Sequence, residues 1–84
     1  MIYLKLVLDS EIRNISGPRV RTARLNNNIT QKELSIKLET LGVYIDRASI
    51  SKIEQQNRII MDIELLALSK VLKVSVNWLL GLER

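Results

Sequence analysis

One short segment gathers the side chains whose types and spacing could do chemistry. Residues 46–56 read DRASISKIEQQ. We expect a helix there because Asp46 is a favourable N-cap and because Ile50 and Ile53 recur at helical spacing. By the 3.6-residue period, the opposite face carries Arg47, Ala48, Ser51, Lys52 and Gln55. Arginine and lysine can donate hydrogen bonds to guanine, serine is permissive, and alanine can contact a thymine methyl group. Such a face suits a DNA major groove, whereas the simpler alternative is a polar helix face that is only solvated.

The composition excludes most catalytic and metal chemistry. The chain has 84 residues with no cysteine and no histidine, so zinc sites of the Cys/His kind and Ser-His or Cys-His nucleophile pairs are excluded. The sequence also lacks a glycine-rich loop and a cluster of carboxylates. We therefore predict that the protein is not an enzyme and that it uses no metal, no cofactor and no small-molecule ligand.

The hydropathy of the chain argues against membrane insertion. No apolar run approaches the roughly 20 residues needed to cross a bilayer. The chain begins MIYLKLVLDS, where no basic region precedes the short apolar run and no small-residue cleavage site follows it, so we expect no signal peptide. The length allows one domain at most, and we expect it to be soluble and cytoplasmic.

The positive charge is confined to the middle of the chain. The formal net charge is +4, and residues 1–18 and 59–84 each sum to zero. Residues 19–58 hold eight basic and four acidic side chains, so the whole excess lies there. A localised basic surface suits a polyanion, although a solvated mixed-charge surface is the alternative.

One local pattern, repeated along the chain, predicts five helices. A polar N-cap flanked by apolar residues at N′ and N4 is typical of a helix start, and it occurs at Ser16, Thr30, Asp46, Asp62 and Ser75. Thr30 is followed by Glu33, which completes a capping box. The first helix should end at Asn26–Asn28, and the last at Gly81. The expected interior residues are Val20, Ala23, Leu25, Leu34, Leu38, Leu41, Ile50, Ile53, Leu65, Leu66, Leu68, Ser69, Leu72 and Trp78.

The first residues follow a different period. Ile2, Leu4, Leu6 and Leu8 alternate with Tyr3, Lys5 and Val7, which indicates a strand with one buried face. A lone strand next to a helical domain could pair with the same strand of a second subunit, and the alternatives are irregular chain or a helix extension. We therefore divide the chain into an N-terminal extension, residues 1–15, and a helical domain, residues 16–84.

Three motifs in order carry a resemblance to a known family. The segments TQKEL, ISKIE and LLALSKVLKVSVNWLLG resemble the Cro and lambda-repressor-like helix-turn-helix proteins, also called the XRE family, over about residues 16–82. The resemblance implies an all-α, five-helix bundle that binds double-stranded operator DNA, usually as a homodimer, and regulates transcription. The alternative function is a protein-interaction module, antitoxin-like or phage-regulatory, built on the same bundle.

The resemblance also implies roles for individual residues. Base reading would fall to the front and outer face of the second helix of the motif, together with the first residue of the preceding helix: Gln31, Arg47, Ala48, Ser51 and Lys52. Phosphate contacts would come from Arg19, Arg21, Thr30, Asn57 and Arg58. Arg24 and Glu54 match a charged pair that commonly ties two helices in this family, so we expect them to be structural. The alternative is that Arg24 faces phosphate and Glu54 is merely exposed.

Two departures from the family pattern concern turns. Family members usually place glycine soon after ISxIE, where the chain turns with positive φ, whereas this chain has Gln55-Gln56. The turn could therefore be altered, or the helix could run longer. The connection before residue 46 is also long, because Gly42 comes eleven residues after Gln31. We expect residues 39–41 to lengthen the helix by about one turn, and residues 42–44 to bend the chain back.

Overall fold

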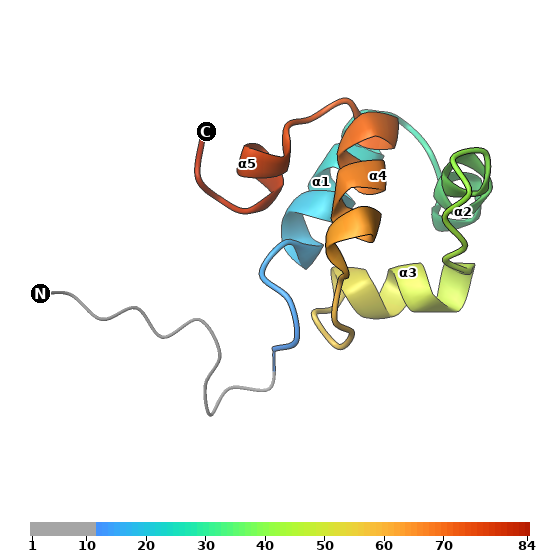
Figure 1. Cartoon of the computed structure of the whole chain (residues 1–84), viewed down its shortest axis with the longest axis horizontal. Coiled ribbons are helices and arrows are strands. Elements are labelled where there is room, and N and C mark those ends of the chain that lie inside the picture. Colours follow the sequence, from blue (N-terminus) through green and yellow to red (C-terminus); the bar gives the residue numbers. More distant parts are fainter. Residues whose placement is uncertain (1–11) are drawn as a thin grey trace, which may run out of the picture.

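Residues 12–84 form a bundle of five helices. The computed structural model describes residues 12–84, and their elements are α1 (Gly17–Asn26), α2 (Gln31–Glu39), α3 (Arg47–Glu54), α4 (Asp62–Leu72) and α5 (Val76–Leu79). Figure 1 shows α4 in the centre, with α1 and α5 on one side and α2 on the other, while α3 crosses below. No strand is present between residues 12 and 84. The predicted strand at residues 2–8 lies outside the described residues.

The helix starts follow the capping chemistry of the sequence, with two differences. The Thr30 hydroxyl accepts from the Glu33 backbone N–H and the Glu33 carboxylate accepts from the Thr30 N–H, which completes the expected capping box. Asp46 and Ser75 also accept backbone N–H groups at the starts of α3 and α5. The prediction for the fourth start was one residue late, because Met61 and not Asp62 is the N-cap of α4.

The other difference concerns the start of α1. Ser16 occupies the N-cap position but makes no capping hydrogen bond with its side chain. The side-chain oxygen of Asn14 accepts from the Gly17 N–H at 2.7 Å instead. Its side-chain nitrogen donates to the carbonyls of Ile53 and Arg58. Asn14 therefore both caps α1 and ties its start to the end of α3.

Each of the five helices in residues 12–84 is followed by a residue in the left-handed conformation, at or directly after the C-cap or, for α2, after one further tight turn. These residues are Asn28, Gly42, Gln56, Lys73 and Gly81. In each case the backbone N–H of the next residue reaches back to a carbonyl five positions earlier, which is the Schellman arrangement. The left-handed residue at 56 settles the first departure, because the family turn is kept with glutamine in place of glycine, at φ 64°. Two hydrogen bonds hold it there, from the Arg13 N–H to the Gln56 carbonyl and from the Gln56 side chain to the Asn14 carbonyl.

The connection between α2 and α3 is longer by a tight turn. The α-helix ends at Glu39, and the Leu41 and Gly42 N–H groups then bond to carbonyls three residues earlier, as in a 3₁₀ turn. Gly42, at φ 79°, reverses the chain. Ile45 then becomes fully buried in front of α3. The expected extra turn is present, but its last residues are not α-helical.

The core lies where α1, α2, α3 and α5 meet around α4. Eleven apolar residues are buried there, among them Leu34, Leu38, Ile50, Ile53, Leu68, Leu72 and Leu79. Trp78 packs against this cluster while remaining partly exposed. Three of the predicted interior residues were wrong: Leu25, Leu41 and Leu66 are each about half exposed. Leu25 is near the end of α1, Leu41 is in the turn after α2, and Leu66 is on the side of α4 that no other helix covers.

Candidate nucleic-acid interface

The outer face of α3 presents the polar side chains that the sequence placed there. Ile50 and Ile53 are fully buried on the inner face, so the helix is held in one rotation about its axis. Arg47, Ala48 and Lys52 are exposed on the outer face, and Ser51 is partly buried there. The helix itself spans Arg47–Glu54, with Asp46 and Gln55 as its caps, slightly shorter than the predicted 46–56. Its free face is therefore short, polar and basic.

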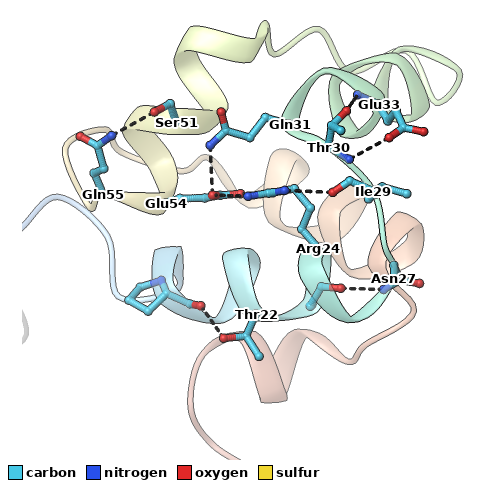
Figure 2. A network of polar contacts seen from close by, with 12 residues as sticks. Thr22, Arg24, Asn27, Ile29, Thr30, Gln31, Glu33, Ser51, Glu54 and Gln55 are labelled. Atoms are coloured by element: carbon cyan, nitrogen blue, oxygen red, sulfur yellow. Dashed lines mark hydrogen bonds and ion pairs between the residues drawn. The ribbon is translucent and has the colours of Figure 1, made fainter.

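The first residue of α2 lies beside the last turn of α3. Gln31, the first residue of α2, donates from its amide nitrogen to the Glu54 carboxylate at 3.1 Å. Figure 2 shows this amide reaching from α2 across to α3, above the pair formed by Arg24 and Glu54. The amide oxygen of Gln31 makes no hydrogen bond to the described residues. Gln31 is thus fixed in position by α3 and retains an acceptor.

A buried ion pair joins α1 to α3 under this surface. The Arg24 guanidinium donates to both carboxylate oxygens of Glu54, at 2.7 and 3.1 Å, and a third bond reaches the Ile29 carbonyl at 2.9 Å (Figure 2). The two side chains are only 9% and 3% exposed. The hydrogen bonds that Arg24 donates to the Glu54 carboxylate are the main reason why the pKa of Arg24 is raised. Arg24 and Glu54 therefore set the distance between α1 and α3, and neither is free to bind a ligand.

A basic hollow opens beside the first residues of α2 and α3. Its volume is about 650 Å³, and it is lined by Arg24, Thr30, Gln31, Lys32 and Arg47. Lys32 was not among the predicted site residues. A lysine in the first turn of a helix opposes the helix dipole, and that unfavourable placement was a signal in the sequence. Two helix starts, each with positive backbone N–H groups, thus meet at one concave surface with Lys32 and Arg47.

The five predicted phosphate-binding residues are not gathered in one place. Thr30 lines the hollow, and Asn57 is exposed just after α3. Arg21 is exposed on α1, one turn before Arg24. Arg19 instead stacks on the Trp78 ring, with its guanidinium carbon 4.9 Å from the ring centre, on the side of α1 that faces α5.

Arg58 has a structural partner. Its guanidinium donates to both oxygens of the Glu64 carboxylate, at 2.9 Å each, and Glu64 also accepts the Met61 N–H at the start of α4. The Arg58 side chain remains 29% exposed, whereas that of Glu64 is 4% exposed. Arg58 therefore holds the α3–α4 connection, and part of its side chain remains open to solvent.

The residues described bring no metal site together, since no three acidic side chains cluster between residues 12 and 84. None of the helices in that range is long and apolar enough to span a membrane.

We predict that the domain loses stability in acid. The Arg58 hydrogen bonds lower the pKa of Glu64 below its ordinary 4.5, outweighing burial. Capping bonds with Thr30 and Ser49 similarly lower the pKa values of Glu33 and Asp46. A carboxylate with a depressed folded-state pKa contributes stability above its unfolded pKa and loses it as pH falls through the folded value. The free energy of unfolding, measured with urea, should therefore be nearly constant above about pH 5 and fall steadily below it.

The matched variant for this prediction is Glu64→Gln. It should lower stability at neutral pH by removing one partner of a pair, yet show a shallower loss between neutral pH and acid. If the urea midpoint of the native protein does not move on acidification, these carboxylates do not stabilise the fold in the way proposed.

Comparisons with known proteins agree with the helical arrangement described above. A helix-turn-helix family profile, HTH_3, matches residues 20–79, well over half of the chain. The P22 c2 repressor, solved in complex with synthetic operator 9T in the presence of Tl⁺, is 28% identical, with a TM-score of 0.70 over 83% of this chain and 98% of that chain. A hypothetical transcription factor, NHTF from Neisseria, is 24% identical, with a TM-score of 0.69 over 90% of this chain and 88% of that chain. No curated protein matches. The expected five-helix, lambda-repressor-like bundle is confirmed.

Proposed function

This chain belongs to the helix-turn-helix family, and we propose that it is a sequence-specific transcriptional regulator of the repressor type, which reads double-stranded DNA with α3. The observation that carries the proposal is the outer face of α3, where Arg47, Ala48, Ser51 and Lys52 are accessible while the inner face is locked by buried isoleucines. The P22 c2 repressor, which shares the fold, is seen with an operator.

The roles of the residues follow from their positions. Arg47 and Lys52 would donate to base edges, Ser51 would adapt to either kind of base, and Ala48 would contact a thymine methyl group. The Gln55 amide already donates to the Ser51 hydroxyl oxygen at 3.0 Å, which orients Ser51 and leaves its proton free to donate. Gln31 would contribute its free amide oxygen from α2.

Phosphate contacts would position the protein on the duplex without reading its sequence. Thr30, Arg21, Asn57 and the newly recognised Lys32 are the accessible candidates around α3. Arg19 and Arg58, which already pair with Trp78 and Glu64, would contribute only the exposed part of each side chain. We also propose that the protein acts in the cytoplasm and that it is not an enzyme.

We further propose that the protein binds DNA as a homodimer. Two copies would place two recognition helices on successive turns of the major groove, about 34 Å apart. The pairing of residues 2–8 between subunits is the suggested contact, and these residues lie outside the described part of the chain.

The native protein would first be used to select its preferred site from a library of random DNA duplexes. Replacing Arg47 or Lys52 by alanine should weaken binding to this selected site by about 1–3 kcal/mol per lost base contact, or roughly 5- to 150-fold. Both side chains are exposed on the outer face of α3, so replacing them should leave folding unaffected. Fluorescence anisotropy with the selected duplex, together with circular dichroism of each variant, would measure both quantities.

Lys37→Ala is the charge-matched control. Lys37 is an exposed lysine in the last turn of α2, outside the basic hollow, and its removal should change affinity by less than about twofold. Affinities for the native site that stay unchanged in both α3 variants would refute base reading by this face. Equally weak, salt-sensitive binding to random and selected DNA would favour the protein-interaction module instead.

A further inference from the structure

An apolar groove lies on the side of the bundle formed by α4 and the turn after α2. It is lined by Leu41, Gly42, Val43, Ile63, Leu66, Ala67 and Lys70. Ile63, Leu66 and Lys70 follow one face of α4 at spacings of three and four residues. Leu41, Ile63 and Leu66 are 50%, 60% and 49% exposed. The α2–α3 connection, which is longer than the usual family spacing, supplies one wall of this groove.

A second exposed apolar surface, which we call the strip, is formed by Ile59 and Met61 between the end of α3 and the start of α4. Ile59 and Met61, in the connection that leads into α4, are 65% and 57% exposed. Ile60, between them, faces the core. Half of the large exposed apolar side chains in the described chain belong to this strip and groove: Leu41, Ile59, Met61, Ile63 and Leu66. A concentration of this kind marks an interaction site.

The chain enters the domain at one end of the strip. The Arg13 N–H donates to the Gln56 carbonyl at 2.8 Å. The Asn14 side chain donates to the Arg58 carbonyl at 2.8 Å. Residues 12–14 are thus fixed beside residues 56–58, directly before Ile59, and Figure 1 shows the described chain beginning near the end of α3. The described chain therefore begins next to the strip.

The preceding segment matches the strip in chemistry and in length. Ile2, Leu4, Leu6 and Leu8 recur every second residue, so an extended segment would place them on one side. Eleven extended residues span up to roughly 36 Å, whereas α4 is about 16 Å long. The segment can therefore reach the groove from residue 12. The groove volume of about 280 Å³ is below the range of roughly 300–1,000 Å³ for small-molecule sites, so peptide side chains suit it better.

We propose that residues 2–8 lie along this strip of their own chain, with Ile2, Leu4, Leu6 and Leu8 packed toward the groove. This arrangement gives the apolar face of the predicted strand a surface to cover, and it leaves a backbone edge free for the proposed pairing with a second subunit. It does not depend on DNA binding. The short tether favours the same chain over a second copy, because it holds the segment at a high effective concentration.

Crosslinking tests the proposal in the full-length chain, which has no native cysteine. Leu6→Cys combined with Leu66→Cys should react with a short bismaleimide to give an intrachain product, which runs as a monomer in denaturing gels. The control pairs Leu6→Cys with Leu25→Cys, since Leu25 is equally exposed, at 48% against 49%, on α1. The groove pair should react about tenfold faster than the control pair. Equal rates, or a product only at twice the monomer mass, would overturn the proposal.

A second measurement uses the alternation of the segment. In the full-length chain, Leu4→Ser with Leu6→Ser should uncover the groove and raise the fluorescence of the apolar dye ANS about twofold or more. Tyr3→Ser with Lys5→Ser changes the other face and should leave the signal unchanged. Equal signals from the two double variants would also overturn the proposal.

Discussion

Glu54→Ala is expected to destabilise the domain by about 3–5 kcal/mol, because it leaves the Arg24 guanidinium buried without its partner. The carboxylate accepts three hydrogen bonds, two from Arg24 and one from Gln31, and the Arg24 side chain is only 9% exposed. A small domain has a total stability of about 5–15 kcal/mol, so this one change should remove a large share of it. Urea unfolding followed by circular dichroism measures the loss.

Two comparisons separate the ion pair from a general effect of truncation. Glu39→Ala removes an exposed carboxylate at the end of α2 and should change stability by less than about 0.5 kcal/mol. Replacing both partners with apolar residues, Arg24→Met with Glu54→Leu, should cost much less than Glu54→Ala alone, because no uncompensated charge remains. A Glu54→Ala variant as stable as Glu39→Ala would show that the pair does not hold α1 against α3.

Gly17→Ala is the second change for which we expect a large effect on stability. The higher helix propensity of alanine and the lack of space for a Cβ atom act in opposite directions at this position. Gly17 is in the first turn of α1, where alanine would ordinarily favour the helix by up to about 1 kcal/mol. A Cβ atom there would lie 2.1 Å from the Ile53 carbonyl oxygen and 3.1 Å from that of Glu54. These are backbone atoms at the end of α3, which cannot rotate away. We expect a net loss of about 3 kcal/mol, at the upper end for overpacking.

Gly42→Ala provides the matched control for Gly17→Ala. A Cβ at residue 42 would meet no atom within 4 Å, and only its left-handed φ of 79° opposes the change, at a cost of about 1–2 kcal/mol. Thermal unfolding of the two variants should therefore rank Gly17→Ala as the less stable. A Gly17→Ala protein more stable than the native one would mean that α1 and α3 are not in close contact at this point.

Much of the fold could be predicted because local chemistry and global packing agree. Thr30 with Glu33, and Asp46 ahead of Ile50, are complete signals within a few residues. The end of α1 was likewise marked by Asn28, which tolerates a left-handed backbone. Gln56 carries no such signal, since it is held by Arg13 and Asn14 from a distant part of the chain.

The remaining errors concern which surfaces stay uncovered. Leu25, Leu41 and Leu66 are apolar at helical spacing, but burial depends on whether another element packs over them. The same is true of charged side chains. Arg58 pairs with Glu64 because of the way α4 packs, which the sequence pattern alone does not specify. Lys32 could have been recognised from its unfavourable position in the first turn of α2. The position of the α3 face, by contrast, followed directly from Ile50 and Ile53.

The central claim is that α3 reads DNA sequence through its outer face, and selection from a random duplex library tests it most directly. The native protein should enrich one motif, with two half-sites related by symmetry if it binds as a dimer. The Arg47→Ala protein should enrich a motif that has lost its preference at one position in each half-site. Identical motifs from both proteins, or no enrichment above the starting library with the native protein, would contradict the account.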